Sequence, residues 1–116
     1  MKLTAAMSIL VVMGASPVFA DCTSPDETKV VIPSGAQATR DEMVAAQAAV
    51  KAFDTAVAAY SDCLKQDEDA KVAAGGDKAK VHNEVVKLNN EAVMKLQLIA
   101  DKFNEELRAF KAKNTQ

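Results

Sequence analysis

The sequence predicts an all-α protein: a long antiparallel two-helix hairpin whose extended N-terminal arm is tethered by a disulfide to the first helix. Three observations predict it. Two long stretches repeat apolar residues at helical spacing, and a Gly-Gly pair separates them. The chain has only two cysteines, one upstream of the first stretch and one near its end. With 116 residues, it is expected to form one domain at most.

The first twenty residues are expected to be a signal peptide. Lys2 is their only charge, a mostly apolar run follows, and Val18 and Ala20 suit a cleavage site after residue 20. A membrane anchor is the alternative, but the uncharged run is short and contains polar residues, Gly and Pro. Asp21 before Cys22 disfavours a lipoprotein, which needs a small residue there. We therefore expect a periplasmic protein with no membrane span in its mature chain.

The expected mature chain has few large core residues. It contains one tyrosine, three phenylalanines and no tryptophan. Its 13 basic and 16 acidic residues give a formal charge of −3, which provides no reason to expect a nucleic acid or an anionic membrane as partner. Since an exported compartment is oxidising, Cys22 and Cys63 are expected to form a disulfide that supplements a thin core.

Residues 21–38 are expected to form an extended arm. Pro25 and Pro33 favour extended geometry in their neighbours, and a frayed terminus is the alternative. The disulfide favours an ordered arm, because about 17 residues reach roughly 55 Å when extended, whereas the helix up to Cys63 needs only about 36 Å. We therefore expect residues 30–32 to lie along the alanine side of the first helix. That side consists of Ala45, Ala48, Ala52, Ala56 and Ala59.

The first helix is expected over residues 39–73. Thr39 followed by Glu42 is the signature of a capping box, and the Gly-Gly pair at residues 75–76 ends the pattern. The residues expected to form its buried stripe are Met43, Ala46, Val50, Phe53, Val57, Tyr60 and Leu64.

The second helix is expected over residues 78–112, after a turn at 74–77, with Asp77 as N-cap. Its apolar stripe has a period near 3.6 to 3.7 residues, which favours a gently crossed hairpin over a regular coiled coil. Folding back near residue 75 makes facing positions add up to about 150. The members of the stripe are Val81, Val85, Leu88, Ala92, Leu96, Ile99, Phe103, Leu107 and Phe110.

Apolar residues also occur on the far side of the second helix. Met94 and Leu98 are four residues apart there, with Val86 and Val93 on one flank. One interpretation is a set of tolerated surface residues. The other is a self-association face or a groove for a protein partner, because the residues stack at helical spacing.

Residues that carry catalysis or bind metals are sparse. His82 is the only histidine, the acidic run at 67–69 lacks the spacing of a calcium loop, and Met43 and Met94 lie on different faces. Cys63 is expected to be oxidised, and no serine or histidine is placed to form a nucleophilic pair. We therefore expect no enzyme, no catalytic residues, no cofactor, no metal and no small-molecule ligand.

The chain resembles a family of small, uncharacterised exported proteins of Gram-negative bacteria. The residues that carry the resemblance are Cys22, 33–36 (PSGA), Met43, 46–53 (AQAAVKAF), Tyr60, Cys63, Leu64, 90–93 (NEAV), 100–104 (ADKFN) and 108–113 (RAFKAK). The resemblance implies a periplasmic helical hairpin and no activity. Two functions follow as expectations: a structural or interaction protein that self-associates through its outer faces, or a small stress-type chaperone that binds apolar clients.

Overall fold

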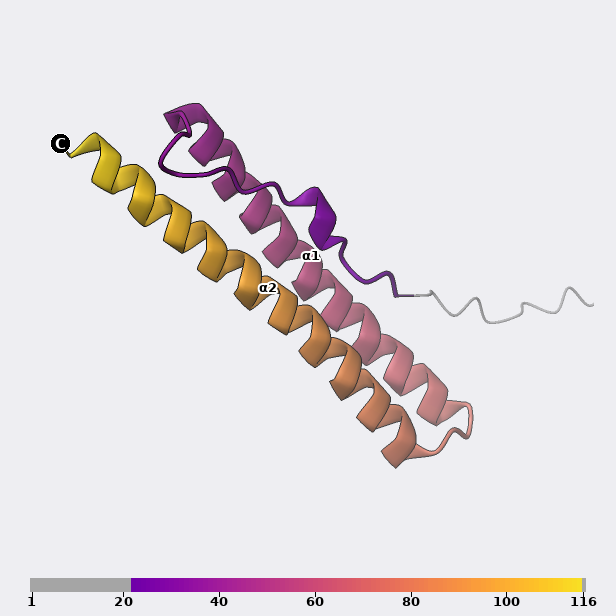
Figure 1. Ribbon diagram of the computed structural model, residues 1–116. Helices are drawn as coiled ribbons and strands as arrows, with labels where there is room; N and C mark the ends of the chain where they lie inside the picture. The colour runs from indigo at the N-terminus through magenta and orange to yellow at the C-terminus, as the bar shows by residue number, and fades with distance from the viewer. Residues whose placement is uncertain (1–21, 116) are drawn as a thin grey trace, which may run out of the picture.

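The computed structural model describes residues 22–115, and the expected signal peptide lies outside these residues. Within this range the chain consists of a 3-10 turn, η1 (Glu27–Lys29), and two long helices, α1 (Arg40–Ala73) and α2 (Lys78–Asn114), with no strand. Figure 1 shows the two helices side by side, joined at one end by a short turn. The arm, residues 22–38, runs back along α1 (Figure 1).

Side-chain caps set where both helices begin. The hydroxyl of Thr39 accepts a hydrogen bond from the Glu42 N–H at 3.2 Å, and the Glu42 carboxylate accepts one from the Thr39 N–H at 2.7 Å. The expected capping box is therefore confirmed. Asp77 caps α2 by accepting a hydrogen bond from the Lys80 N–H at 3.0 Å. Between the helices, Gly75 has a φ of 95°, a conformation that glycine adopts without strain.

The apolar stripe of α1 is covered more completely than that of α2. Six of its seven expected members are buried, and only Val50 is half-buried. On α2 only Ala92 and Phe103 are buried, and the other seven members of its stripe are half-buried. One helix and a narrow arm leave much of α2 in contact with solvent, so the core is thin.

The core consists of two clusters, each with residues from both helices. The first combines Phe53, Val57, Tyr60, Leu64 and Ala92 with half-buried Cys22, Val30, Val85, Leu88, Val93, Leu96 and Ile99. The second combines Ala38, Met43, Ala46 and Phe103 with Ile32, Val50, Leu107 and Phe110. Both clusters include residues of the arm, so the arm completes the core of the hairpin.

Two polar contacts between the helices show the same register as the clusters. The Ser61 hydroxyl donates a hydrogen bond to the Asn89 side-chain oxygen, and Nδ1 of His82 lies 2.7 Å from Oε1 of Glu68. In each pair the residue numbers add up to 150, the value expected for a chain that folds back near residue 75.

Candidate functional site

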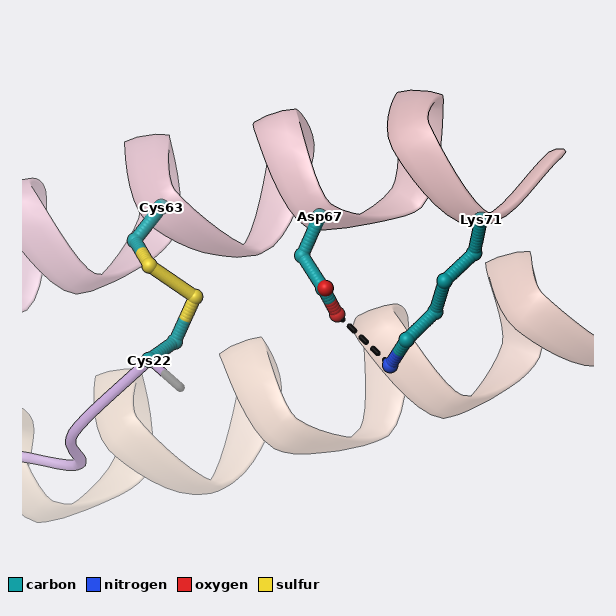
Figure 2. Close-up of a disulfide and its surroundings, with 4 residues drawn as sticks. All are labelled: Cys22, Cys63, Asp67 and Lys71. Atoms are coloured by element: carbon teal, nitrogen blue, oxygen red, sulfur yellow. Dashed lines mark ion pairs between the residues drawn. A yellow bond between two sulfur atoms is a disulfide. The ribbon is translucent and has the colours of Figure 1, made fainter. Parts of the chain in front are cut away.

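A disulfide joins the arm to α1, as expected from the sequence. Cys22 and Cys63 are bonded, with their Cα atoms 5.7 Å apart and both residues half-buried. Figure 2 shows the bond between the arm and α1, with the Asp67–Lys71 ion pair farther along the same helix. That pair spans 2.7 Å. The disulfide closes the arm and most of α1 into one covalent loop.

Polar contacts attach the arm to α2 as well. Near its start, Lys95 Nζ lies 3.0 Å from a carboxylate oxygen of Glu27. Near its end, Lys113 Nζ donates a hydrogen bond to the carbonyl oxygen of Ala38 at 2.7 Å and lies over the ring of Phe110. The arm therefore bridges both helices.

Gly35 lies directly against the backbone of α2. Its N–H donates a hydrogen bond to the Glu106 carboxylate at 2.7 Å. A Cβ atom at this position would be 1.7 Å from the Glu106 carbonyl oxygen and 2.9 Å from the Phe110 nitrogen, so only glycine fits. Ser34-Gly35 is a residue pair typical of turns, but no local signal in the sequence indicates that the turn contacts α2.

The arm alternates between the core and solvent along its extended part. Val30 packs against the first core cluster and Ile32 against the second, whereas Val31 between them is 72% exposed. The expected docking over the alanine side is right only in part: Ala45, Ala52 and Ala56 line a groove beside the arm, but all five alanines of that side remain exposed. The apolar side chains of the arm pack where the core lies between the helices, since more apolar surface is buried there.

An open groove separates the arm from α1. One part of it, about 420 Å³ in volume, lies between arm residues including Lys29 and Val30 and the α1 residues Ala49, Ala52 and Phe53. A second part, about 320 Å³, continues along α1 past Val31. We call these two parts the arm groove. Its α1 wall is made mostly of alanine, so it is apolar and shallow.

The four residues expected to form an interaction face differ in exposure. Met94 is 59% and Leu98 68% exposed, Val86 is 40% exposed, and Val93 is half-buried against the first core cluster. Val44 on α1 is also exposed, at 56%. Its position off the apolar stripe of the first helix is the signal in the sequence that could have identified it.

Comparisons with known protein families, with curated proteins and with solved structures found no match to this chain. The resemblance to exported helical proteins therefore has no support from them.

Residues 22–115 contain no cluster of three or more His, Cys, Asp or Glu side chains arranged to hold a metal ion. Neither α1 nor α2 is long and apolar enough to cross a membrane.

The carboxylates that attach the arm are held in their charged form. The N–H of Gly35, and then the Lys102 ammonium, lower the pKa of Glu106 below its ordinary value of 4.5. Hydrogen bonds from its own N–H and from Lys95 likewise lower the pKa of Glu27. A carboxylate with a lowered pKa in the folded state stabilises that state above its ordinary pKa and loses this effect as the pH falls through the lowered value.

Acidification is therefore expected to loosen the arm. As the pH falls below 4.5 and through the lowered pKa of Glu106, protonation of this carboxylate should weaken its bond to Gly35, and the Gly35 amide should lose protection from hydrogen exchange. An NMR pH titration that follows this amide measures the effect. In Glu106→Gln the protection should be low already at neutral pH, whereas Asp54→Asn, far from the arm contacts, should behave like the wild type. A Gly35 amide whose protection is the same from neutral to low pH would contradict the prediction.

Proposed function

We propose that this protein is a non-enzymatic structural or interaction protein of the periplasm. A disulfide between the arm and α1 is compatible with an oxidising compartment. The resulting hairpin is cross-linked and thin, which suits a chain that presents surface to other proteins more than one that encloses a substrate.

One observation carries this proposal: large apolar side chains are exposed on a covalently closed hairpin. Val31, Val44, Met94 and Leu98 are between 56% and 72% exposed. They lie on the arm and on both helices, so the apolar surface is distributed around the molecule. Several exposed apolar side chains on so small a domain favour contact with other protein surfaces.

The proposal includes an antiparallel arrangement of the two helices. Phe53 and Leu96 share one core cluster, Met43 and Leu107 share the other, and both pairs add up to about 150. Antiparallel packing gives the hairpin two long outward faces, one on each helix, for contacts with partners.

Photo-crosslinking in cells tests the proposal. A photoreactive residue in place of Val44 or Leu98 should give covalent adducts with protein in the exported fraction after illumination. The same residue in place of Lys78, an exposed charged position at the start of α2, serves as the control and should give few adducts. Absence of adducts from both Val44 and Leu98 would contradict an interaction role.

A chaperone for apolar clients is the second candidate, and the exposed Met94 and Leu98 favour it. In that case the purified protein should suppress aggregation of an unfolded client, and Leu98→Asp should weaken the effect. A wild-type protein that suppresses no client aggregation would rule this candidate out.

A further inference from the structure

The arm is most firmly attached where it meets α1. Gly35 and Ala38 are buried, and they are hydrogen-bonded to the side chains of Glu106 and Lys113 of α2. There is no room for a Cβ atom at residue 35, because the backbone there lies directly against α2. These contacts are made without the disulfide, so this end of the arm should stay attached longer when that bond is opened.

The other end of the arm depends on the disulfide. No residue in the range 22–34 is buried. Besides the Cys22–Cys63 bond, residues 22–30 are attached by the packing of Val30 against the first core cluster and by the Glu27–Lys95 ion pair. The two side chains of that pair are 42% and 40% exposed, and ion pairs this exposed contribute little to stability. The disulfide is therefore the main attachment of this end.

The arm lies along the line where α1 and α2 meet, which we call the seam. Cys22 and Val30 pack there against the first core cluster, whose buried members come from both helices, such as Tyr60 of α1 and Ala92 of α2. Farther along the arm, Ile32 packs against the second cluster. The arm covers the seam from the start of α1 as far as Cys22.

The seam continues beyond Cys22 as an open groove about 230 Å³ in volume. Its apolar lining consists of Leu64, Val81, Val85 and Leu88. Asp67 also lines it, and Figure 2 shows this residue on the same side of α1 as the disulfide, farther toward the hairpin turn. The open groove thus begins where the arm ends and follows the same line.

We propose that the seam binds an extended segment of another protein, and that the arm occupies part of this site until the Cys22–Cys63 disulfide is reduced. The inference rests on the interaction role proposed above and names the kind of partner. The arm itself shows which chemistry fits. It supplies apolar side chains at alternate positions, Val30 and Ile32, and an acidic one, Glu27, opposite Lys95 of α2.

Continuity with the open groove lets a partner segment compete with the arm. The described arm ends at Cys22, whereas a longer segment on the same line also fills the groove beside Leu64 and Val85. Such a segment buries more apolar surface than the arm, which favours its binding. The arm keeps the advantage of being part of the same chain, and the disulfide makes that advantage decisive.

Release of the arm needs a dithiol as reductant. One thiolate of the dithiol attacks a sulfur atom of the disulfide, and the other cysteine leaves as a thiolate that takes up a proton. The second thiol of the reductant then displaces the first cysteine in the same way. Two electrons and two protons pass to the protein, so that Cys22 and Cys63 become thiols and the reductant becomes an internal disulfide. Both cysteines are only half-buried, which gives a reductant access.

An NMR titration tests the inference. The nitrogen-labelled full chain, expressed with its own first twenty residues, is titrated before and after reduction with dithiothreitol. The probe is a synthetic peptide of residues 23–32 preceded by Leu-Ser-Leu-Ser-Val, whose apolar side chains alternate along the open groove. The apparent dissociation constant equals the intrinsic one divided by the fraction of molecules with an open seam. Reduction should therefore lower it about tenfold or more, with amide shifts at Val85 and Leu88.

Two controls accompany the titration. The double-serine variant Cys22→Ser/Cys63→Ser should bind the peptide with and without dithiothreitol alike, which separates opening of the disulfide from other effects of the reductant. A peptide that carries Val30→Asp and Ile32→Asp should bind neither form, because charged side chains would be buried in the seam.

A charge swap shows whether the peptide lies where the arm lies. The wild type should prefer the peptide with Glu27, and Lys95→Glu should prefer a peptide with Glu27→Lys. Both peptides compete with the same arm in a given protein, so the ratio of their dissociation constants reports this contact alone. Lys111→Glu, about 160° around α2 from Lys95, is the matched control and should keep the preference of the wild type.

Four results would overturn the inference: equal binding by the oxidised and the reduced protein, no binding by the reduced protein, a preference that Lys95→Glu does not reverse, or loss of the helical circular dichroism on reduction. Cys22–Cys63 links between chains after reoxidation would make a second copy the occupant and would also overturn it. Failure of the peptide to bind, together with adducts from Val44 or Leu98 in cells, would refute the seam as the site and leave the interaction role standing.

Discussion

Replacing Cys22 and Cys63 with serine is expected to lower the free energy of unfolding by about 4 kcal/mol. The two residues are 41 apart in sequence, and their bond closes a loop that contains the arm and most of α1. Opening a loop of this size gives the unfolded chain more conformational freedom, which favours unfolding. Urea denaturation of the oxidised wild type and of the double-serine variant measures the difference.

Reduction of the wild type is the matched control. The reduced protein and the double-serine variant should unfold at similar urea concentrations, because both lack only the covalent link. If the free energy of unfolding of the double-serine variant is within about 1 kcal/mol of that of the oxidised protein, the non-covalent contacts of the arm hold the arm in place without the disulfide.

Loss of the disulfide should affect one end of the arm first. At this end Cys22 packs against the first core cluster, and farther along the arm Glu27 forms an ion pair with Lys95 of α2. The other end has its own attachments at Gly35 and Ala38. Hydrogen exchange in the reduced protein should therefore rise around residues 22–30 before it rises around residues 35–38.

The helices could be predicted because their signals are local. The capping box needs only Thr39 and Glu42, three residues apart, and the structure contains it. The stripe of α1 follows helical spacing, and almost all of it is buried. Apolar residues that recur at helical spacing identify the buried face of a helix, even when the element that covers that face is not known.

The position of the arm was harder to predict because it depends on residues far apart in sequence. Cys22 and Cys63 indicated that the arm returns to α1, which the disulfide confirms. They carried no information on contacts with α2, such as the one between Gly35 and Glu106, which are 71 residues apart. The alanine side was expected to receive the arm, yet Val30 and Ile32 pack into the core clusters instead.

The candidate interaction surface was predicted only in part. Met94 and Leu98 are exposed, as the far-side pattern indicated. The alanine side of α1 was expected to be covered by the arm, and its exposure was not predicted. Alanine favours helices in any setting, so an alanine row does not distinguish a covered surface from an open one. Only the exposure of each residue in the folded hairpin distinguishes the covered surface from the open one.

Gly35→Ala is expected to lower the free energy of unfolding by about 3 kcal/mol. The added methyl group would lie 1.7 Å from the Glu106 carbonyl oxygen, an atom of the α2 backbone that cannot move aside. The turn must then shift away from α2, which breaks the hydrogen bond from the Gly35 N–H to the Glu106 carboxylate. Urea denaturation measures the loss.

Gly75→Ala is the matched control, because both variants add one methyl group to a glycine outside the helices. Apart from Gly75 itself and its two chain neighbours, no residue has an atom within 4 Å of the site of its Cβ, so its cost comes from the positive φ alone and should be about 1 kcal/mol. A Gly35→Ala protein no less stable than Gly75→Ala would contradict the close contact with α2.

The disulfide and Gly35 hold the same segment, so their effects should not add. In the double-serine background part of the arm is already free, and Gly35→Ala should then cost less than in the oxidised protein. A double-mutant cycle in urea measures this coupling. Fully additive effects would mean that the two ends of the arm detach independently, whereas a smaller second effect means that the arm packs as one cooperative unit between the disulfide and α2.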